Sequence, residues 1–435
     1  MSTKRQRIAE LARNCRDMAF TNLAHHIDME WMLTAHARTR KDGAVGVDGQ
    51  TAAEYEVNLE ANLQNLLDRA KSGTYVAPPV RRVHIPKAGS ATETRPLGIP
   101  TYEDKILQRV VLLVLEPVYE TDFLDVSHGF RPGRGAHGAL QSLWQQEMNM
   151  RGGWIVDVDL RKFFDTINHG HLREFLKRRV RDGVILRLIG KWLNAGVLEE
   201  GVLTTPDEGT PQGGVISPLL ANIFLHYVLD EWFETEVCPR LKGRAFVIRY
   251  ADDFVIGVAR EDDARRIMEV LPKRMSKHGL TVHPEKTRLV RFQPPQAASS
   301  ETEERDPPEP GTFDFLGFTH YWGRSLQGAW VVKRKTAKSR FKRALAALSE
   351  WCRKHLHLPI KEQHQKLTQK LRGHFGYYGI IGNSSSLKDF REEVRKIWRR
   401  WLSRRRRDGD VTWPEFYRLE KRYSLPPARV VHGLR

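Results

Sequence analysis

The sequence predicts a mixed α/β region over residues 1–330 and a helical, basic region over residues 331–435. Residues 1–330 hold 43 Lys and Arg against 44 Asp and Glu, whereas residues 331–435 hold 28 against 9. Short apolar runs typical of strands alternate with helical patterns in the first region, and helical periodicity dominates the second. Positive charge gathered in one segment favours a polyanion, most often a nucleic acid, as partner.

Composition excludes several other classes. The chain has 435 residues, of which 40% are hydrophobic and 29% charged. Its longest strongly apolar run, Val110–Leu115, is far shorter than the roughly 20 residues that span a bilayer. No apolar stretch follows the basic N-terminus, and Cys15, Cys238 and Cys352 lie too far apart for a disulfide framework. We therefore expect a protein of a reducing cytosol with no membrane partner.

Local signals place the elements of the first region in order. Thr51 and Glu54 form a capping box, which predicts a helix that runs to Gly73. The pattern of apolar residues then predicts a strand at 80–85 and a buried helix at 101–118. It predicts a second strand at 154–160 and a second helix at 217–237. The acidic, proline-rich stretch 294–311 has no apolar periodicity and is predicted to be a disordered insertion.

Acidic residues follow or join several predicted strands. Phe246–Tyr250 and Phe254–Val258 form a hairpin signal whose tip carries Asp252 and Asp253. The strand at 154–160 ends near Asp159. Carboxylate oxygens are the ligands that Mg²⁺ prefers, and two such ions can activate a hydroxyl and stabilise a leaving pyrophosphate. Asp157 and Asp165 compete with Asp159 for this role, and spacing alone does not separate them.

Two glycine-rich loops add to this set. The loop Gly209–Pro218 leads into a predicted helix, and its glycines allow close approach of a ligand to the main chain. A second loop carries Arg131 and Arg134 between glycines and a proline. These arginines suit contacts with phosphates, and ion pairs with acids elsewhere in the fold are the alternative.

Together these motifs resemble, in order, those of the reverse transcriptase/maturase encoded by group II introns. The Tyr250–Asp253 segment resembles the Tyr-x-Asp-Asp box, and the Asp159–Phe164 segment resembles the acidic motif that precedes it. The other segments that carry the resemblance are 46–49, 95–100, 128–137, 210–217, 278–280, 284–287 and 315–318. The resemblance covers about residues 40–400. It implies a right-hand polymerase with an α/β fingers-palm region and an N-terminal extension over 1–330, followed by a helical, basic, maturase X-like thumb with a basic tail over 331–435.

The resemblance also implies roles for individual residues. Asp159, Asp252 and Asp253 match the catalytic acids that bind two Mg²⁺ ions, with the main-chain carbonyl of Leu160 as a further ligand. Five residues match the nucleotide-binding set, in which Phe164 excludes a ribose 2′-hydroxyl: Lys87, Arg95, Phe164, Gln212 and Lys286. A surface salt bridge is the alternative for Lys286, and a solvated basic hairpin is the alternative for Lys87 and Arg95. The match to the primer grip comprises Phe315, Leu316 and Gly317. Phe163 suits a core position better than Phe164 does.

The basic residues of the second region are predicted to contact nucleic acid. They are Lys333, Arg334, Lys335, Arg399, Arg400, Arg404 and Arg405. A solvated helical face is the alternative. Aromatic rings interleaved with this charge favour nucleic acid, because a merely solvated face has no use for them: Trp351, Tyr377, Tyr378, Trp398 and Trp401.

The implied function is RNA-templated DNA synthesis from a 3′-hydroxyl primer with dNTPs, combined with binding of the parent intron RNA for splicing and retrohoming into target DNA. A free-standing relative that works in defence or DNA repair without an intron is the alternative. About 105 residues follow the predicted boundary, and no cysteine pair stands among them. Second-strand cleavage by an added endonuclease is therefore not expected.

Overall fold

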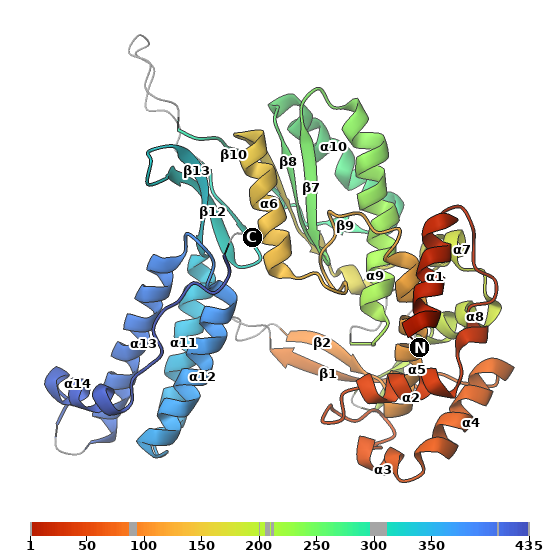
Figure 1. Ribbon diagram of the computed structural model, residues 1–435, viewed down its shortest axis with the longest axis horizontal. Coiled ribbons are helices and arrows are strands. Elements are labelled where there is room, and N and C mark those ends of the chain that lie inside the picture. Colours follow the sequence, from red (N-terminus) through yellow and green to blue (C-terminus); the bar gives the residue numbers. More distant parts are fainter. Residues whose placement is uncertain are drawn as a thin grey trace. The chain divides into compact units, whose positions relative to one another are not determined.

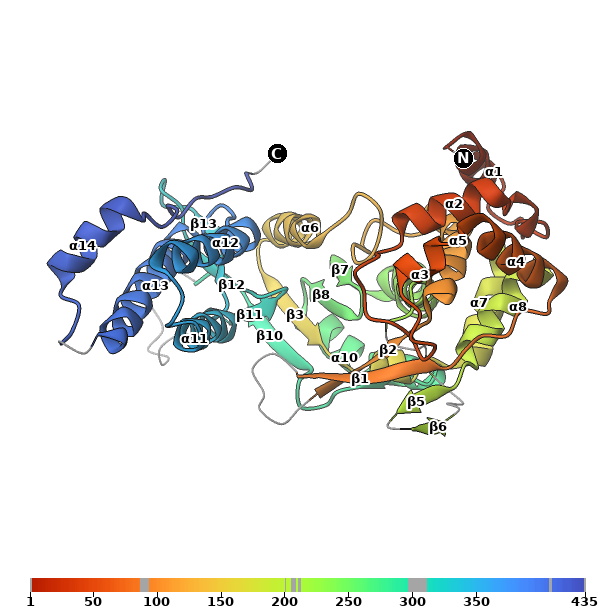
Figure 2. The same ribbon diagram turned by 90° about the horizontal axis from the view of Figure 1, so that it is seen from below.

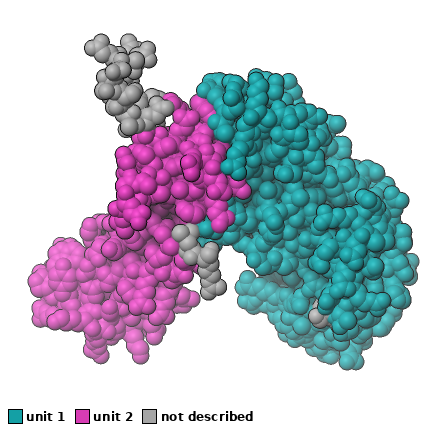
Figure 3. Space-filling model, turned by 45° about the horizontal axis from the view of Figure 1, so that its top comes forward, with its two compact units in different colours: residues 1–142, 156–289 teal, residues 143–155, 290–435 magenta. Residues whose placement is uncertain are grey.

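A computed structural model describes residues 2–86, 94–199, 201–204, 209, 213–295, 311–406 and 409–433. The chain divides into two compact units, residues 1–142 with 156–289 and residues 143–155 with 290–435 (Figure 3). These units differ from the predicted domains. Residue 330 begins a strand, so the second unit contains a sheet as well as helices. In the described part of the chain, no helix combines the length and the apolar character needed to cross a membrane.

Helices dominate the N-terminal part of the first unit. They are α1 (Ser2–Asn14), α2 (Met29–Arg38), α3 (Ala52–Glu56), α4 (Leu59–Ser72) and α5 (Tyr102–Tyr119). The capping box of Thr51 and Glu54 is present, but the single predicted helix is interrupted between α3 and α4. Gly73 ends α4 in the left-handed conformation, as predicted. The apolar helix α5 packs against α1 and α2 (Figure 2).

A four-stranded sheet in the order β2-β1-β5-β6 follows. Its strands are β1 (Val80–Pro86), β2 (Thr94–Ile99), β5 (Val197–Glu199) and β6 (Val202–Thr204). Helices α7 (His169–Arg179) and α8 (Gly183–Leu193) precede β5 in the chain, and α8 contacts both α4 and α7. The strand predicted at 80–85 is β1, confirmed and extended by one residue.

The second sheet has the order β10-β3-β8-β7. Its strands are β3 (Gly153–Val158), β7 (Ala245–Tyr250), β8 (Asp253–Val258) and β10 (Arg288–Phe292), and the division between the units passes through β3 and β10. The short strands β4 (Leu160–Arg161) and β9 (Thr281–Val282) pair with each other. The remaining helices are α6 (Ala136–Met150), α9 (Ser217–Leu225), which continues in two π-helical turns to Val237, and α10 (Glu261–Lys277).

The second unit joins a small antiparallel sheet to a helical bundle (Figure 1). The strands are β11 (Phe313–Phe315), β12 (Phe318–Arg324) and β13 (Trp330–Thr336). The helices are α11 (Lys338–Lys354), α12 (Ile360–Tyr378), α13 (Ser384–Arg405) and α14 (Trp413–Arg422). Leu371, Phe390 and Trp398 lie in the bundle core. Of the predicted insertion 294–311, all but the ends lies outside the described residues.

Candidate active site

The hairpin of β7 and β8 carries two of the three predicted acids at its tip. Tyr250 pairs with Asp253, so only Ala251 and Asp252 form the connecting loop. Ala251 has a φ of 57°, in the left-handed region that tight two-residue hairpin turns require. The side chain of Asp252 is half-buried and that of Asp253 is exposed. The tip therefore holds two carboxylates on a short, well-defined turn.

Asp159 directly follows β3, the neighbour of β8 in the sheet. Its main chain is held from both sides: its N–H donates to Thr287 Oγ1 at 3.3 Å, and its carbonyl accepts from the N–H of His283 at 2.8 Å. Lys286 Nζ lies 3.6 Å from Asp159 Oδ2. The competing residue Asp157 instead forms an ion pair of 3.0 Å with Arg288.

Electrostatics link the acids of the two strands. Burial raises the pKa of Asp252, and the nearby charge of Asp159 raises it further. The positive charges of Arg95 and Arg249 oppose this rise in pKa. A partly desolvated carboxylate beside a second carboxylate is an unfavourable pair that a bound cation would stabilise.

Whether a metal ion fits the three aspartates depends on the type and arrangement of their ligand atoms. Within the described ranges, no three His, Cys, Asp or Glu side chains converge on one point as a ready-made metal site. The three aspartates are nevertheless oxygen donors of the type that hard divalent cations take. The residues fit a divalent cation by donor type and by the electrostatics of Asp252.

A buried polar network supports the hairpin, and the sequence analysis did not predict it. Arg249 and Asp230 form an ion pair with fully buried side chains, in which Arg249 Nε donates to Asp230 Oδ1 at 2.8 Å. Arg249 Nη1 also donates to Asn222 Oδ1 at 2.9 Å and to the carbonyl of Ala251 at 3.0 Å. The sequence does contain a signal for this network, because Arg249 lies in the otherwise apolar predicted strand Phe246–Tyr250 and a buried arginine needs a partner.

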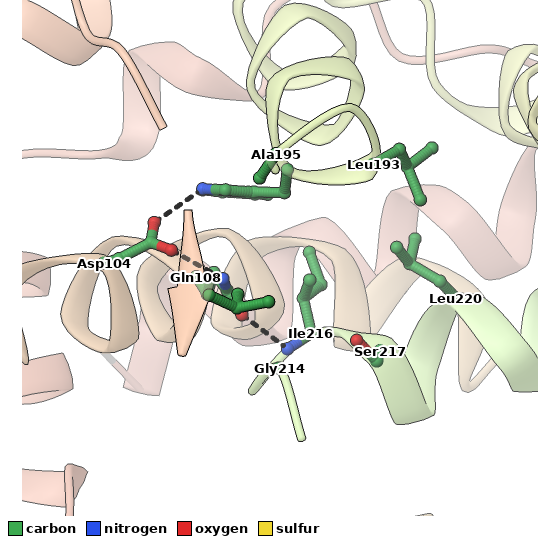
Figure 4. Close-up of a pocket in the computed structure, with 10 residues that line it drawn as sticks. Asp104, Gln108, Leu193, Ala195, Gly214, Ile216, Ser217 and Leu220 are labelled. Atoms are coloured by element: carbon green, nitrogen blue, oxygen red, sulfur yellow. Dashed lines mark hydrogen bonds between the residues drawn. The ribbon is translucent and has the colours of Figure 1, made fainter. Parts of the chain in front are cut away.

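A second buried network supports the glycine-rich loop. Asp104 accepts hydrogen bonds from the Tyr75 hydroxyl, Trp192 Nε1 and Gln108 Nε2. The carbonyl oxygen of the Gln108 side chain accepts the N–H of Val215 at 2.8 Å. It also accepts the N–H of Ile216 at 3.4 Å (Figure 4). Burial raises the pKa of Asp104 to about 6. An acid at the start of the apolar helix α5 thus fixes the end of the loop through one glutamine.

The structure describes only part of the predicted nucleotide-binding set. Lys87 and Gln212 lie outside the described residues. Arg95 is exposed on β2, and its charge acts on Asp252. Phe163 is buried, 2% exposed, whereas the neighbouring Phe164 is half-buried. This difference in burial agrees with a core role for Phe163 and leaves Phe164 available at the site.

The structure corrects the prediction for Arg131. Its side chain is buried and forms an ion pair with Glu120, and it donates to the carbonyls of Leu124 and Ser127. The alternative of a paired arginine therefore holds for Arg131, because its donors are used inside the fold. Arg134 pairs with the exposed Asp125.

Comparison with known protein families gives two matches along the chain. Residues 85–320 match the family model described as reverse transcriptase (RNA-dependent DNA polymerase). The chain belongs to this reverse transcriptase family. Residues 341–418 match a second model, the group II intron maturase-specific domain. Family membership implies the right-hand polymerase fold, and the second match coincides with the helices of the second unit.

The chain is also similar to curated proteins, several of which are named for introns. It is 36% identical over 260 residues to Protein YkfC of Escherichia coli (strain K12), covering 52% of this chain and 67% of that protein. It is 37% identical over 225 residues to the group II intron-encoded protein LtrA of Lactococcus lactis subsp. cremoris, covering 51% of this chain but only 37% of LtrA. It is 33% identical over 177 residues to Nuclear intron maturase 2, mitochondrial, of Arabidopsis thaliana, covering 31% of this chain and 24% of that protein.

The basic residues that were predicted to contact nucleic acid in the second unit divide into buried and exposed groups. Arg334, 6% exposed, lies over the ring of Trp144, and burial lowers its pKa. Its burial favours the alternative interpretation, in which Arg334 has a structural role. Lys333 and Arg399 are half-buried, and Arg399 donates to the carbonyl of Val411 at 2.7 Å. The exposed members of the predicted set are Lys335, Arg400, Arg404 and Arg405.

The interleaved aromatic residues also need correction. Trp398 is fully buried in the bundle core, and Trp351, Tyr378 and Trp401 pack against that core. These rings therefore contribute to the packing of the helices. Cationic side chains lie over two of them: Lys370 lies 5.7 Å from the ring centroid of Trp351, and Arg404 lies 5.2 Å from that of Trp401.

The predicted primer grip is a tight hairpin turn in the second unit. Phe315 pairs with Phe318, and both Leu316 and Gly317 between them have positive φ, 49° and 82°. The Tyr377 hydroxyl donates to the Leu316 carbonyl at 2.8 Å, and the N–H of Ala337 donates to the Gly317 carbonyl at 3.0 Å. Contacts from the helical bundle therefore fix the conformation of this turn.

Proposed function

We propose that this reverse transcriptase extends a 3′-hydroxyl primer on an RNA template with dNTPs, and that the site formed by Asp159, Asp252 and Asp253 performs this step. The observation that supports the proposal is the adjacency of β3 and β8 in one sheet, because Asp159 directly follows β3 and Asp253 begins β8. The charge of Asp159 also raises the pKa of Asp252. The family match supports the class of reaction, and the residues supply its location.

The three aspartates, with the main-chain carbonyl of Leu160, would hold two divalent cations, and oxygen ligands favour Mg²⁺. When bound, such ions supply activation of the primer hydroxyl and stabilisation of the charge on the leaving pyrophosphate. The residues themselves provide orientation. The network of Arg249 fixes the turn that carries Asp252, and the contacts with Thr287 and His283 fix the main chain of Asp159.

Charged side chains beside the acids would handle the triphosphate. Arg95 would bind phosphate oxygens of the incoming dNTP, because an exposed guanidinium on β2 is a good donor for them. Lys286, 3.6 Å from Asp159, would donate a proton to the pyrophosphate as its bond to the α-phosphorus breaks. Phe164 would fill the space that a ribose 2′-hydroxyl needs.

The test is extension of a labelled DNA primer annealed to an RNA template, with Mg²⁺ and four dNTPs. We expect products that depend on the template and disappear when a chelator removes the metal. Products that form equally without a template would contradict the assignment, because terminal addition does not need the RNA strand.

We further propose that the protein binds its parent intron RNA, promotes splicing, and takes part in insertion of the intron into target DNA. The match of residues 341–418 to the maturase-specific domain supports this role. Binding and splicing of the intron that flanks the gene would be measured with wild-type protein and with Asp252→Asn. Splicing that persists in the variant supports a role separate from polymerisation. If the protein extends primers but binds no flanking RNA, the free-standing role in defence or repair becomes the better explanation.

A further inference from the structure

The loop that was predicted to present Arg131 to nucleic acid presents a different residue. Phe130 is 59% exposed, while its neighbours His128 and Arg131 are buried at 5% and 6% exposed. A phenylalanine between two buried polar residues reverses the usual preference, in which the apolar side chain faces the core. The loop therefore places the charge inside and the ring outside.

The fold holds this loop firmly on both sides of Phe130. The N–H of His128 donates to the carbonyl of Arg249 at 2.9 Å, and Asn222 Nδ2 donates to the carbonyl of Gly129 at 2.7 Å. Arg131 is fixed by Glu120 and by the carbonyls of Leu124 and Ser127. The exposure of the ring is thus imposed by a rigid main chain.

The main chain of Phe130 is also strained. Its φ is 58°, in the left-handed region that bulky L-residues rarely adopt. Three of the other described non-glycine residues with positive φ, Lys162, Ala251 and Leu316, lie in the predicted catalytic and primer-grip motifs. Strained conformations of this kind are retained mainly at functional sites. A single exposed apolar residue is ordinary, but one held in a strained conformation needs an explanation.

The position of the loop suggests what the ring contacts. A Cβ atom on Gly129 would lie 2.3 Å from the main-chain nitrogen of Ala251, so only glycine permits this contact. Phe130 therefore directly follows the residue that touches the hairpin turn carrying Asp252. Within the described residues, the Phe130 ring has no aromatic or cation–π partner, although its neighbour Arg131 lies over Phe123.

We propose that Phe130 is a nucleic-acid contact residue of the polymerase site, whose ring stacks on a template or primer base at the end of the duplex next to the primer terminus, where a base face is free. The inference rests on the proposed function of the Asp252 hairpin. A flat aromatic ring is the side chain that stacks on bases without regard to sequence, as a polymerase requires. The buried arginine beside it supports the loop and does not bind phosphate.

The first experiment measures equilibrium binding of a labelled RNA–DNA template–primer without dNTPs, followed by primer extension. Phe130→Ala should weaken binding and raise the KM for template–primer about tenfold, within the range for loss of one base–aromatic stack. The KM for dNTP should stay within about twofold, because no contact to the triphosphate is removed. Phe130→Trp, which keeps an aromatic face, should bind within about threefold of wild type.

A second variant separates this role from a role in folding. Phe130→Gly relieves the positive φ, so its melting temperature should equal or exceed that of wild type while template–primer binding falls as in Phe130→Ala. A loss of melting temperature in Phe130→Gly, with binding restored at low temperature, would show a packing role and overturn the proposal.

Abasic nucleotides identify the strand. At each of the last few positions next to the primer terminus, one base is removed from the template or from the primer, and wild type is compared with Phe130→Ala. At the contacted position the two proteins should bind equally well, because the base that the ring stacks on is absent. If the difference between them survives at every position on both strands, the proposal is wrong. Asp262→Asn gives the reference, since Asp262 is exposed on α10 and outside the site, so its binding should match wild type. Because binding is measured without dNTPs, a difference between wild type and Phe130→Ala stands even if the proposed catalytic role of Asp252 fails.

Discussion

Among single residues, the carboxylates of Asp252 and Asp159 carry the sharpest prediction. Replacing either by Asn keeps the size of the side chain but removes the negative charge that a divalent cation needs. We expect the rate of primer extension to fall at least tenfold, which corresponds to about 1.4 kcal/mol of transition-state stabilisation. The measurement is single-turnover extension on an RNA template.

The matched control for these variants is Asp262→Asn. Asp262 lies exposed on α10 and pairs with Arg260 across 3.2 Å, so its loss should leave extension unchanged. Binding of structured RNA should be the same in all three variants, because the basic helical unit is untouched. If Asp252→Asn keeps more than a tenth of the wild-type rate, the assignment of this hairpin as the catalytic site is wrong.

The two adjacent phenylalanines differ in burial, and this difference predicts different phenotypes. Phe164→Ala should raise incorporation of ribonucleotides relative to deoxyribonucleotides, because the half-buried ring no longer fills the space of the 2′-hydroxyl. Phe163→Ala should instead lower the free energy of unfolding by about 3–5 kcal/mol, as truncation of a buried phenylalanine does. Competition between rNTP and dNTP, together with denaturant unfolding, separates the two. If Phe163 rather than Phe164 controls the choice of sugar, the assignment of Phe164 is wrong and the match to the motif is displaced by one residue.

The sequence analysis identified the acids by their motifs but misjudged Arg131. Whether an arginine on a glycine-rich loop faces a ligand or the core depends on acids and carbonyls that the fold brings near it. Here Glu120, eleven residues earlier, accepts both Nε and Nη2 of Arg131. Local spacing contains no signal for that contact. The same reasoning explains why Arg249 and Asp104 were missed, since their partners come from other elements.

At the scale of elements, local signals predicted most helices and strands. The capping box, the strand that became β1 and the β7–β8 hairpin depend on neighbours a few residues apart, and all three are present. The interruption between α3 and α4, the π-helical turns after α9 and the order of the strands depend on contacts between distant segments. Periodicity within one window cannot report these contacts.

The buried carboxyl of Asp104 predicts how one element responds to pH. Burial raises its pKa from an ordinary value near 4 to about 6, so the folded state binds this proton more tightly than the unfolded state. Its contribution to stability therefore falls as pH rises from about 4 to about 6, by on the order of 3 kcal/mol, and is constant above that range. Asp104→Asn should remove this dependence, measured as the difference in unfolding free energy between the variant and wild type across that window.

Asp104→Asn should also disturb the glycine-rich loop. The amide of Asn would place a donor opposite Gln108 Nε2, which now donates to Asp104 Oδ2 at 3.1 Å. Rotating the Gln108 amide would relieve this clash but would remove the acceptor for the N–H of Val215. We expect a higher KM for dNTP at pH 7 in the variant. An unchanged KM would mean that this network stabilises the fold without positioning the loop.

At the scale of the whole molecule, the charge asymmetry was readable from the sequence, but the boundary of the compact unit that carries the excess charge was not. The excess of Lys and Arg begins near residue 331, whereas the compact unit that contains it begins at Val290 and includes Leu143–Ile155. Charge follows the surface chemistry of a segment, and compactness follows packing. Trp144 and Glu147 belong to the second unit because they contact Val332 and His320.

Salt dependence tests where the basic unit touches nucleic acid. Each phosphate neutralised steepens the fall of log affinity with log salt by about 0.9 for duplex B-DNA and about 0.7 for single strands. The combined variant Arg400→Ala, Arg404→Ala and Arg405→Ala removes three exposed guanidiniums from α13. We expect the slope for structured RNA to flatten by about 0.7 for each phosphate that the variant no longer neutralises, while affinity for dNTP stays the same.

The charge-matched control removes three cations that already have acidic partners on the same helices. Lys396 pairs with Glu393, and Arg353 and Lys354 pair with Glu350, so each is partly neutralised within the protein. Their combined replacement by Ala lowers the net charge by the same amount but should change the salt slope much less. Equal flattening in both variants would mean that net charge alone drives binding and that no defined phosphate contacts lie along α13. A flattened slope only in the α13 variant would locate the RNA-binding surface at the C-terminal end of that helix.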